Sequence, residues 1–170
     1  MGARIIAVLI MMVVASTDAH AHTGAGIQSG FLHPILGWDH LIVMVGVGAW
    51  ASLLGGSAMW KIPLGFIASM VIGGRLGIYG VAIPFVELTI LASILVIAGF
   101  WLFQIKMPEW AGAAVVGFFA IAHGYAHGAE MPAGVSPVQF AAGFLTATGV
   151  LHALGLCLGQ WRFRRLRRAD

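Results

Sequence analysis

Five long apolar segments follow residue 30, and they restrict the fold of this chain more than any other feature. Each is close to the roughly 20 residues that an α-helix needs to cross the hydrocarbon of a bilayer. Glycine, proline or a charged residue interrupts the sequence between them. We therefore predict an all-α integral membrane protein, a compact bundle of about five transmembrane helices within residues 22–161. The predicted helices cover residues 31–54, 62–80, 83–103, 110–128 and 138–160.

The composition excludes an ordinary soluble domain, because 60% of the residues are hydrophobic and only 9% are charged. The sequence pI of 9.6 does not indicate nucleic-acid binding, since five of the nine basic residues lie in the last nine positions. A basic cluster directly after an apolar segment is typical of a cytoplasmic anchor at anionic lipid. We predict a basic cytoplasmic tail over residues 162–170, with membrane lipid as a partner and no nucleic acid.

The N-terminus has the pattern of a secretory signal peptide. Arg4 precedes an apolar run over residues 5–14, and Ala19-His20-Ala21 forms a small-residue cleavage site. We predict a signal peptide over residues 1–21, removed to leave a mature N-terminus in the periplasm.

The loop charges predict the topology. Lys61, Lys106 and the arginine tail fall on one side of a five-helix bundle, and the other connectors carry no lysine or arginine. Because positive loops remain in the cytoplasm, we predict a multi-pass protein of the bacterial inner membrane with a cytoplasmic C-terminus. Gly73, Gly74 and Gly77 are small positions that would allow close helix approach in lipid.

The stretch HPILGWDH places two histidines and an aspartate where the first apolar segment begins. In one continuous helix His33 and His40 would share a face about 10.5 Å apart along the axis, with Asp39 turned to one side. Pro34 can occupy a first helical turn, which predicts a helix start near His33. Ionisable residues in a membrane helix usually face the bundle interior or an aqueous path.

A second polar motif, AHGYAHGAE, lies in the fourth segment. His123, His127 and Glu130 follow an i, i+4, i+7 pattern and share one helix face, with glycine after each histidine. The two motifs supply imidazole and carboxylate donors, which suit nickel, cobalt, zinc or copper better than magnesium or calcium. Cys157 is the only cysteine, so a thiolate cluster within the chain is excluded.

Four further residues have weaker interpretations. His152 is either a fifth imidazole or an interhelical hydrogen-bonding residue. His22, if cleavage exposes it, either chelates a cation through its amine and ring or has no ligand role. Arg75 and Glu87 are interpreted as a structural ion pair across a tight turn.

The two motifs also carry a family resemblance. HPILGWDH fits the pattern HX5DH and HGYAHGAE fits HGX[AV]HGXE, and from about residue 22 to 160 the chain resembles the HupE/UreJ family of nickel/cobalt permeases. The resemblance implies a secondary permease for Ni²⁺ or Co²⁺. By matching position, it implies metal handling by six residues: His33, Asp39, His40, His123, His127 and Glu130.

The chain departs from the family pattern in two places. Ala122 occupies the position where the second motif usually has phenylalanine. Five predicted helices follow the signal peptide where the family generally has six, which leaves open a homo-oligomer that completes the bundle.

We therefore predict a permease for Ni²⁺ and/or Co²⁺ that is not an enzyme and holds no permanent cofactor. HExxH is absent, which argues against a metalloprotease, and no Walker motif is present. A membrane-anchored metal sensor or chaperone would use the same donors and remains an alternative. A bis-histidine haem membrane protein is a second alternative.

Overall fold

The computed structural model describes residues 25–166, and within that range the chain forms α-helices and no strand. The helices are α2 (Ala25–Leu36), α3 (Trp38–Leu54), α4 (Ala58–Ile78), α5 (Val86–Leu102), α6 (Glu109–Ala129) and α7 (Pro137–Leu166). The predicted all-helical fold is confirmed for this part of the chain. The predicted signal peptide over residues 1–21, His22 and the last four residues lie outside it.

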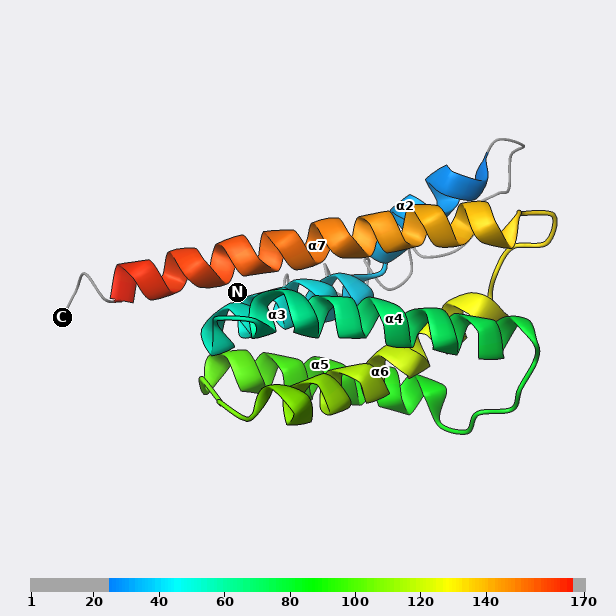
Figure 1. The fold of residues 1–170 in the computed structure, drawn as a ribbon. Coiled ribbons are helices and arrows are strands. Elements are labelled where there is room, and N and C mark those ends of the chain that lie inside the picture. Colours follow the sequence, from blue (N-terminus) through cyan, green and yellow to red (C-terminus); the bar gives the residue numbers. More distant parts are fainter. Residues whose placement is uncertain (1–24, 167–170) are drawn as a thin grey trace, which may run out of the picture.

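The helices form two groups that face each other (Figure 1). One group contains α2, α3 and α7, and the other contains α4, α5 and α6. α7 lies along one side of the molecule and packs mainly against α2 and α3. On the other side α4 packs most extensively against α6, and α5 contacts both α3 and α6. The core between the groups is apolar and fully buried at Val47, Trp50 and Phe66.

By length and composition, two of the described helices are candidate membrane spans. Ala58–Ile78 and Pro137–Arg162 are each long and apolar enough to cross a bilayer. Gly26–Leu36 and Trp38–Leu54 together would form a third span, bent by 79°. Val86–Leu102 is a shorter apolar helix.

The segment predicted as one helix over residues 31–54 is broken at Gly37. Gly37 has an extended backbone, with φ −77° and ψ 105°, so it ends α2 and precedes α3. Pro34 lies inside α2, near its end, so the expectation that it occupies a first helical turn is wrong. The helical turns on both sides remain closed, because Gly37 N–H donates to His33 O and Leu41 N–H donates to Gly37 O.

Glycines set the distance between α4 and α6, as expected for small positions in a membrane bundle. A methyl group added at Gly73 would collide with the backbone of Ile121, and one added at Gly77 would collide with the backbone of Tyr125. From the other side, Gly124 and Gly128 meet the backbone of α4 at Met70 and Gly74. The two helices therefore touch backbone to backbone.

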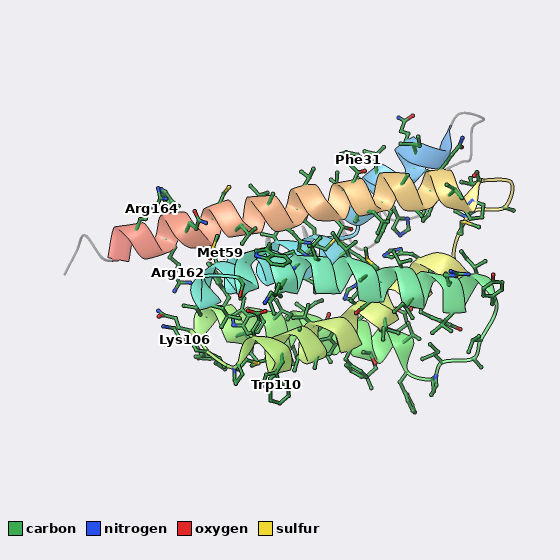
Figure 2. All side chains as sticks on the ribbon, in the orientation of Figure 1. Phe31, Met59, Lys106, Trp110, Arg162 and Arg164 are labelled. Carbon is green, nitrogen blue, oxygen red and sulfur yellow. The ribbon has the colours of Figure 1, made fainter. Side chains whose placement is uncertain are left out.

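The start of the predicted basic tail belongs to α7, which continues to Leu166. The Arg162 guanidinium lies 4.5 Å from the Trp101 ring centroid, a cation–π contact that joins α7 to the end of α5. Figure 2 shows Arg162, Arg164 and Lys106 gathered at the same end of the bundle. Three of the cationic side chains that the prediction assigns to one side of the membrane therefore lie together.

Candidate metal centre

Four imidazoles from three helices meet between the two helix groups. The His127 ring centroid lies 4.4 Å from that of His40 and 4.6 Å from that of His33. His123, one turn before His127, lies 4.9 Å from His40. His40 of α3 thus contacts both histidines of α6. We call these four residues the histidine cluster.

The break at Gly37 forms one half of the histidine cluster. On one continuous helix His33 and His40 would be separated by two turns, about 10.5 Å along the axis. The bend reduces the separation of their ring centroids to 6.2 Å, with the planes at 82°. The two histidines therefore meet across a corner, and the expectation that they share one helix face is corrected.

Three of the four rings are buried and have nitrogen atoms without a hydrogen-bond partner, whereas His33 is half-buried. His123 is fully buried, and His127 and His40 are only 5% and 7% exposed. Four buried ring nitrogens have no hydrogen-bond partner: Nε2 of His40, Nδ1 of His123, and Nδ1 and Nε2 of His127. Buried polar atoms are nearly always paired, so unpaired atoms concentrated in one place require an explanation.

Asp39 orients His40. Its Oδ1 lies 2.7 Å from Nδ1 of the adjacent imidazole. When Nδ1–H donates to this carboxylate, the lone pair remains on Nε2, the nitrogen without a partner. This is the arrangement in which a carboxylate fixes the tautomer of a metal-binding histidine.

Ser93 of α5 orients His123 in the same way as Asp39 orients His40. The sequence did not predict this role. Its hydroxyl donates to Ile90 O at 2.6 Å, and its oxygen lies 3.0 Å from Nε2 of His123. Since the hydroxyl proton goes to Ile90 O, the oxygen accepts Nε2–H, and the lone pair of His123 remains on Nδ1. A single serine in an apolar helix has no spacing signal, so only its position against α6 reveals this role.

The glycines of the second motif explain how α6 can present its histidines. Gly124 and Gly128 each follow a histidine and pack on the α4 backbone. One residue along a helix is a rotation of about 100°, so the preceding histidines turn away from α4 towards α2 and α3.

Glu130 lies beyond the end of α6, exposed, and is not part of the buried cluster. Partial desolvation of the Glu130 carboxyl, and then the negative charge of Glu87, raises its pKa above the usual range. The charge of Glu87 thus opposes ionisation of Glu130. No ion pair between Arg75 and Glu87 is found in residues 25–166. The predicted Arg75–Glu87 pair is wrong.

His152 is buried, and its ring packs against Phe66 rather than against the rings of the histidine cluster. It is 2% exposed, and its nearest aromatic neighbour is Phe66, with ring centroids 5.1 Å apart. Within the described part of the chain, no three His, Cys, Asp or Glu side chains form a ready ligand set. Any cation bound in the cluster would therefore have to draw the imidazoles towards itself.

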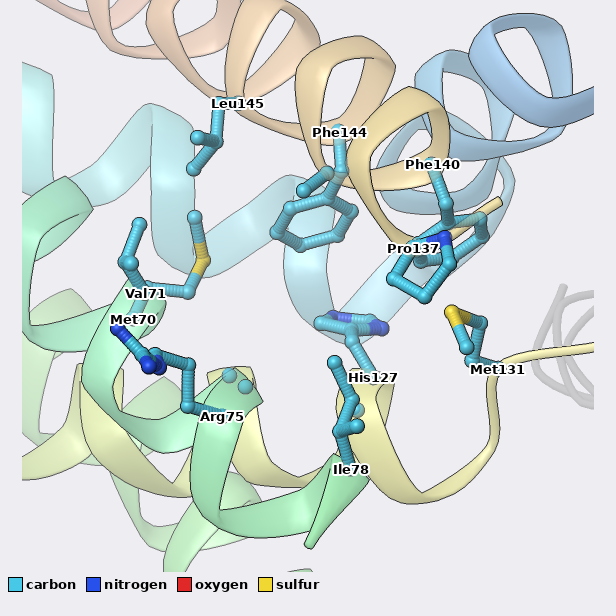
Figure 3. Close-up of a pocket in the computed structure, with 14 residues that line it drawn as sticks. Met70, Val71, Arg75, Ile78, His127, Met131, Pro137, Phe140, Phe144 and Leu145 are labelled. Carbon is cyan, nitrogen blue, oxygen red and sulfur yellow. The ribbon is translucent and has the colours of Figure 1, made fainter. Parts of the chain in front are cut away.

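A cleft of about 120 Å³ reaches His127 between α4, α6 and α7 (Figure 3). Phe140 and Phe144 of α7 form one wall, and Val71 and Ile78 of α4 form the other. The Phe144 ring lies over His127, with centroids 4.1 Å apart. Most of the lining is apolar, and Arg75 and His127 are its polar members.

Comparison with known proteins identifies the family. Residues 7–169 match the family described as "HupE / UreJ protein". The chain belongs to the HupE/UreJ family. The HupE/UreJ resemblance drawn from the two motifs is therefore confirmed. The chain is also 44% identical, over 148 residues, to "Protein HupE" of Rhizobium leguminosarum bv. viciae, an alignment that covers 85% of this chain and 78% of the relative. No solved structure matches it.

Proposed function

We propose that this chain is a permease that carries Ni²⁺ and/or Co²⁺ across the bacterial inner membrane through the histidine cluster. The family to which it belongs is associated with nickel and cobalt uptake. One observation carries the proposal: the unpaired nitrogens of His40, His123 and His127 are buried together between two helix groups. Imidazole nitrogen is a preferred ligand for both metals.

The charges around the cluster support a direction of entry. Glu130 and Glu87 lie at the end of the bundle where α6 ends and α5 begins. Two carboxylates at that end would attract a divalent cation. Partial desolvation first, and then repulsion by the Glu87 carboxylate, raises the pKa of Glu130. We propose that the cation passes from these carboxylates to His33, His40 and His127 and then to His123.

The imidazole donors of the histidine cluster suit transport. A site that conducts must bind strongly enough to admit an ion and weakly enough to release it. Imidazoles held by one hydrogen bond each, as in His40 and His123, can turn towards a cation while water completes its coordination.

The topology proposed for this function has five spans, a periplasmic mature N-terminus and a cytoplasmic C-terminus. It is supported by the gathering of Lys106, Arg162 and Arg164 at one end of the bundle. A reporter fused after Asp170 tests it, because alkaline phosphatase activity there would require a periplasmic C-terminus and would contradict the proposal.

A haem protein is disfavoured by the ring contacts. Axial imidazoles lie on opposite faces of a porphyrin, which needs a flat slot between them. The His127 ring touches both His33 and His40 edge to face or tilted, and the adjoining cleft holds only about 120 Å³.

Uptake of radioactive nickel and cobalt by cells expressing the protein tests the proposal. We expect the wild type to accumulate metal, and His40→Ala and His127→Ala to fall to the level of cells with empty vector. Thr146→Ala, which removes an exposed hydroxyl from α7, is the control and should keep wild-type uptake at matched expression. Normal uptake by both histidine variants would refute the ligand assignment, and metal binding without uptake by the wild type would favour a sensor or chaperone.

A further inference from the structure

Among residues 25–166, His152 is the one buried imidazole that the proposed cluster does not use. It belongs to α7, is 2% exposed, and neither ring nitrogen has a hydrogen-bond partner. A buried polar group without a partner is destabilising, because its lost hydrogen bonds to water are not replaced, so an apolar side chain would serve packing better at this position. The interpretation as an interhelical hydrogen-bonding residue is not supported by these contacts.

The register of α7 gives the depth of His152. Phe144 marks the level of the histidine cluster, because its ring contacts His127. His152 is eight residues further along the same helix, which is about 12 Å along the axis towards the C-terminal end. Thr148 lies midway, fully buried, and its hydroxyl is satisfied by Phe144 O on its own helix.

Phe66 connects the two levels. Its ring is fully buried in the core and lies 6.1 Å from the His123 ring and 5.1 Å from the His152 ring. One aromatic side chain of α4 thus separates the deepest imidazole of the cluster from the next unpaired imidazole. The face of an aromatic ring also attracts cations.

We propose that His152 is an inner binding position for the transported divalent cation, reached from the histidine cluster past the Phe66 ring. This inference rests on the proposed transport function and extends its path inwards. A single imidazole binds a divalent cation weakly, which suits a step between two compartments. The chemistry required is one nitrogen or oxygen donor at this point, held by the packing of α3 against α7.

Substitutions that separate donor chemistry from packing test the proposal. His152→Leu removes the donor and fills the site with apolar atoms, whereas His152→Gln keeps an amide oxygen that can coordinate metal. We expect His152→Leu to lower the initial rate of nickel and cobalt uptake about tenfold or more, as for loss of one metal-site interaction, and His152→Gln to retain part of the rate. Thr148→Val, one turn away, should transport normally.

Stability and binding measurements on the purified proteins complete the test. We expect His152→Leu to unfold at the same temperature as the wild type or higher, and to bind Co²⁺ at the histidine cluster with unchanged absorbance. Wild-type uptake by His152→Leu would overturn the inner position while the proposed function stands. Equal uptake losses in the Leu and Gln variants, with lower unfolding temperatures, would assign His152 to packing and also overturn it. If the wild type shows no uptake, the transport function fails and the inner position fails with it.

Discussion

Oδ1 of Asp39 lies 2.7 Å from Nδ1 of His40, although the two residues are neighbours in the chain. Consecutive residues of a helix point about 100° apart, so this contact requires both side chains to turn towards each other. The other ring nitrogen of His40, Nε2, belongs to the side of the ring away from Asp39 and has no hydrogen-bond partner. In this conformation Asp39 is a positioning residue for an imidazole and not itself a member of the cluster.

Asp39→Asn should therefore weaken metal binding without abolishing it. The amide keeps the size and one oxygen but loses the charge, and changes to such supporting partners typically cost 10–100-fold in metal affinity. Titration of purified protein with Co²⁺, followed by its absorbance, measures the affinity. His40→Ala is the comparison: if Asp39→Asn loses binding as completely as His40→Ala, Asp39 is a direct ligand.

Ser93→Ala should reduce metal affinity through His123. The substitution leaves Nε2 of a fully buried imidazole without a partner, and no longer favours the tautomer with its lone pair on Nδ1. We expect about a tenfold loss in Co²⁺ affinity. Ser93→Thr, which keeps the hydroxyl, should restore most of it.

Thr89→Ala is the matched control for Ser93, because it removes an exposed hydroxyl that bonds Phe85 O on the same helix, α5. It should bind Co²⁺ like the wild type. Equal affinity in Ser93→Ala and Thr89→Ala would show that Ser93 does not position His123.

Gly73→Ala should destabilise the bundle and Gly65→Ala should not. Both residues lie in α4, but a methyl group at Gly73 meets the backbone of Ile121, whereas Gly65 faces open space. Forcing an extra group into a close-packed contact costs typically about 1–3 kcal/mol. Thermal unfolding in detergent, followed by circular dichroism, compares the two variants, and equal unfolding temperatures would mean that α4 and α6 are not in backbone contact.

Arg75 and Glu87 should behave as independent residues. Since they form no ion pair in the described structure, the changes in free energy of unfolding from Arg75→Gln and Glu87→Gln should add to within about 0.5 kcal/mol in the double variant. A double-mutant cycle by denaturant unfolding measures this. Coupling well above that value would restore the ion pair expected from the sequence.

Much of the candidate site could be predicted from sequence spacing, because helical periodicity is local. His123 and His127 are one turn apart on a regular helix, and the structure keeps them on one face of α6. The glycines of α4 also pack as small residues in a membrane bundle should, since a missing side chain allows close approach at any depth.

The sequence was misleading wherever the outcome depended on backbone geometry or on a distant partner. The corner at Gly37 depends on the φ and ψ of one residue, which no hydrophobic pattern encodes. Ser93 and Phe66 acquire their relation to His123 only through the packing of α5 and α4 on α6. Arg75 and Glu87 were expected to pair across the tight turn between their helices, but they form no ion pair in residues 25–166.

The break at Gly37 affects the size of ion that the histidine cluster can bind, because it makes the distance between His33 and His40 adjustable. In an unbroken helix the helical rise fixes the spacing between the backbones of two ligand residues. Here His33 and His40 lie on two separate helices, α2 and α3, which are joined by Gly37 alone. A small backbone rotation at Gly37 would change the distance between the two imidazoles while α2 and α3 each keep their packing against α7.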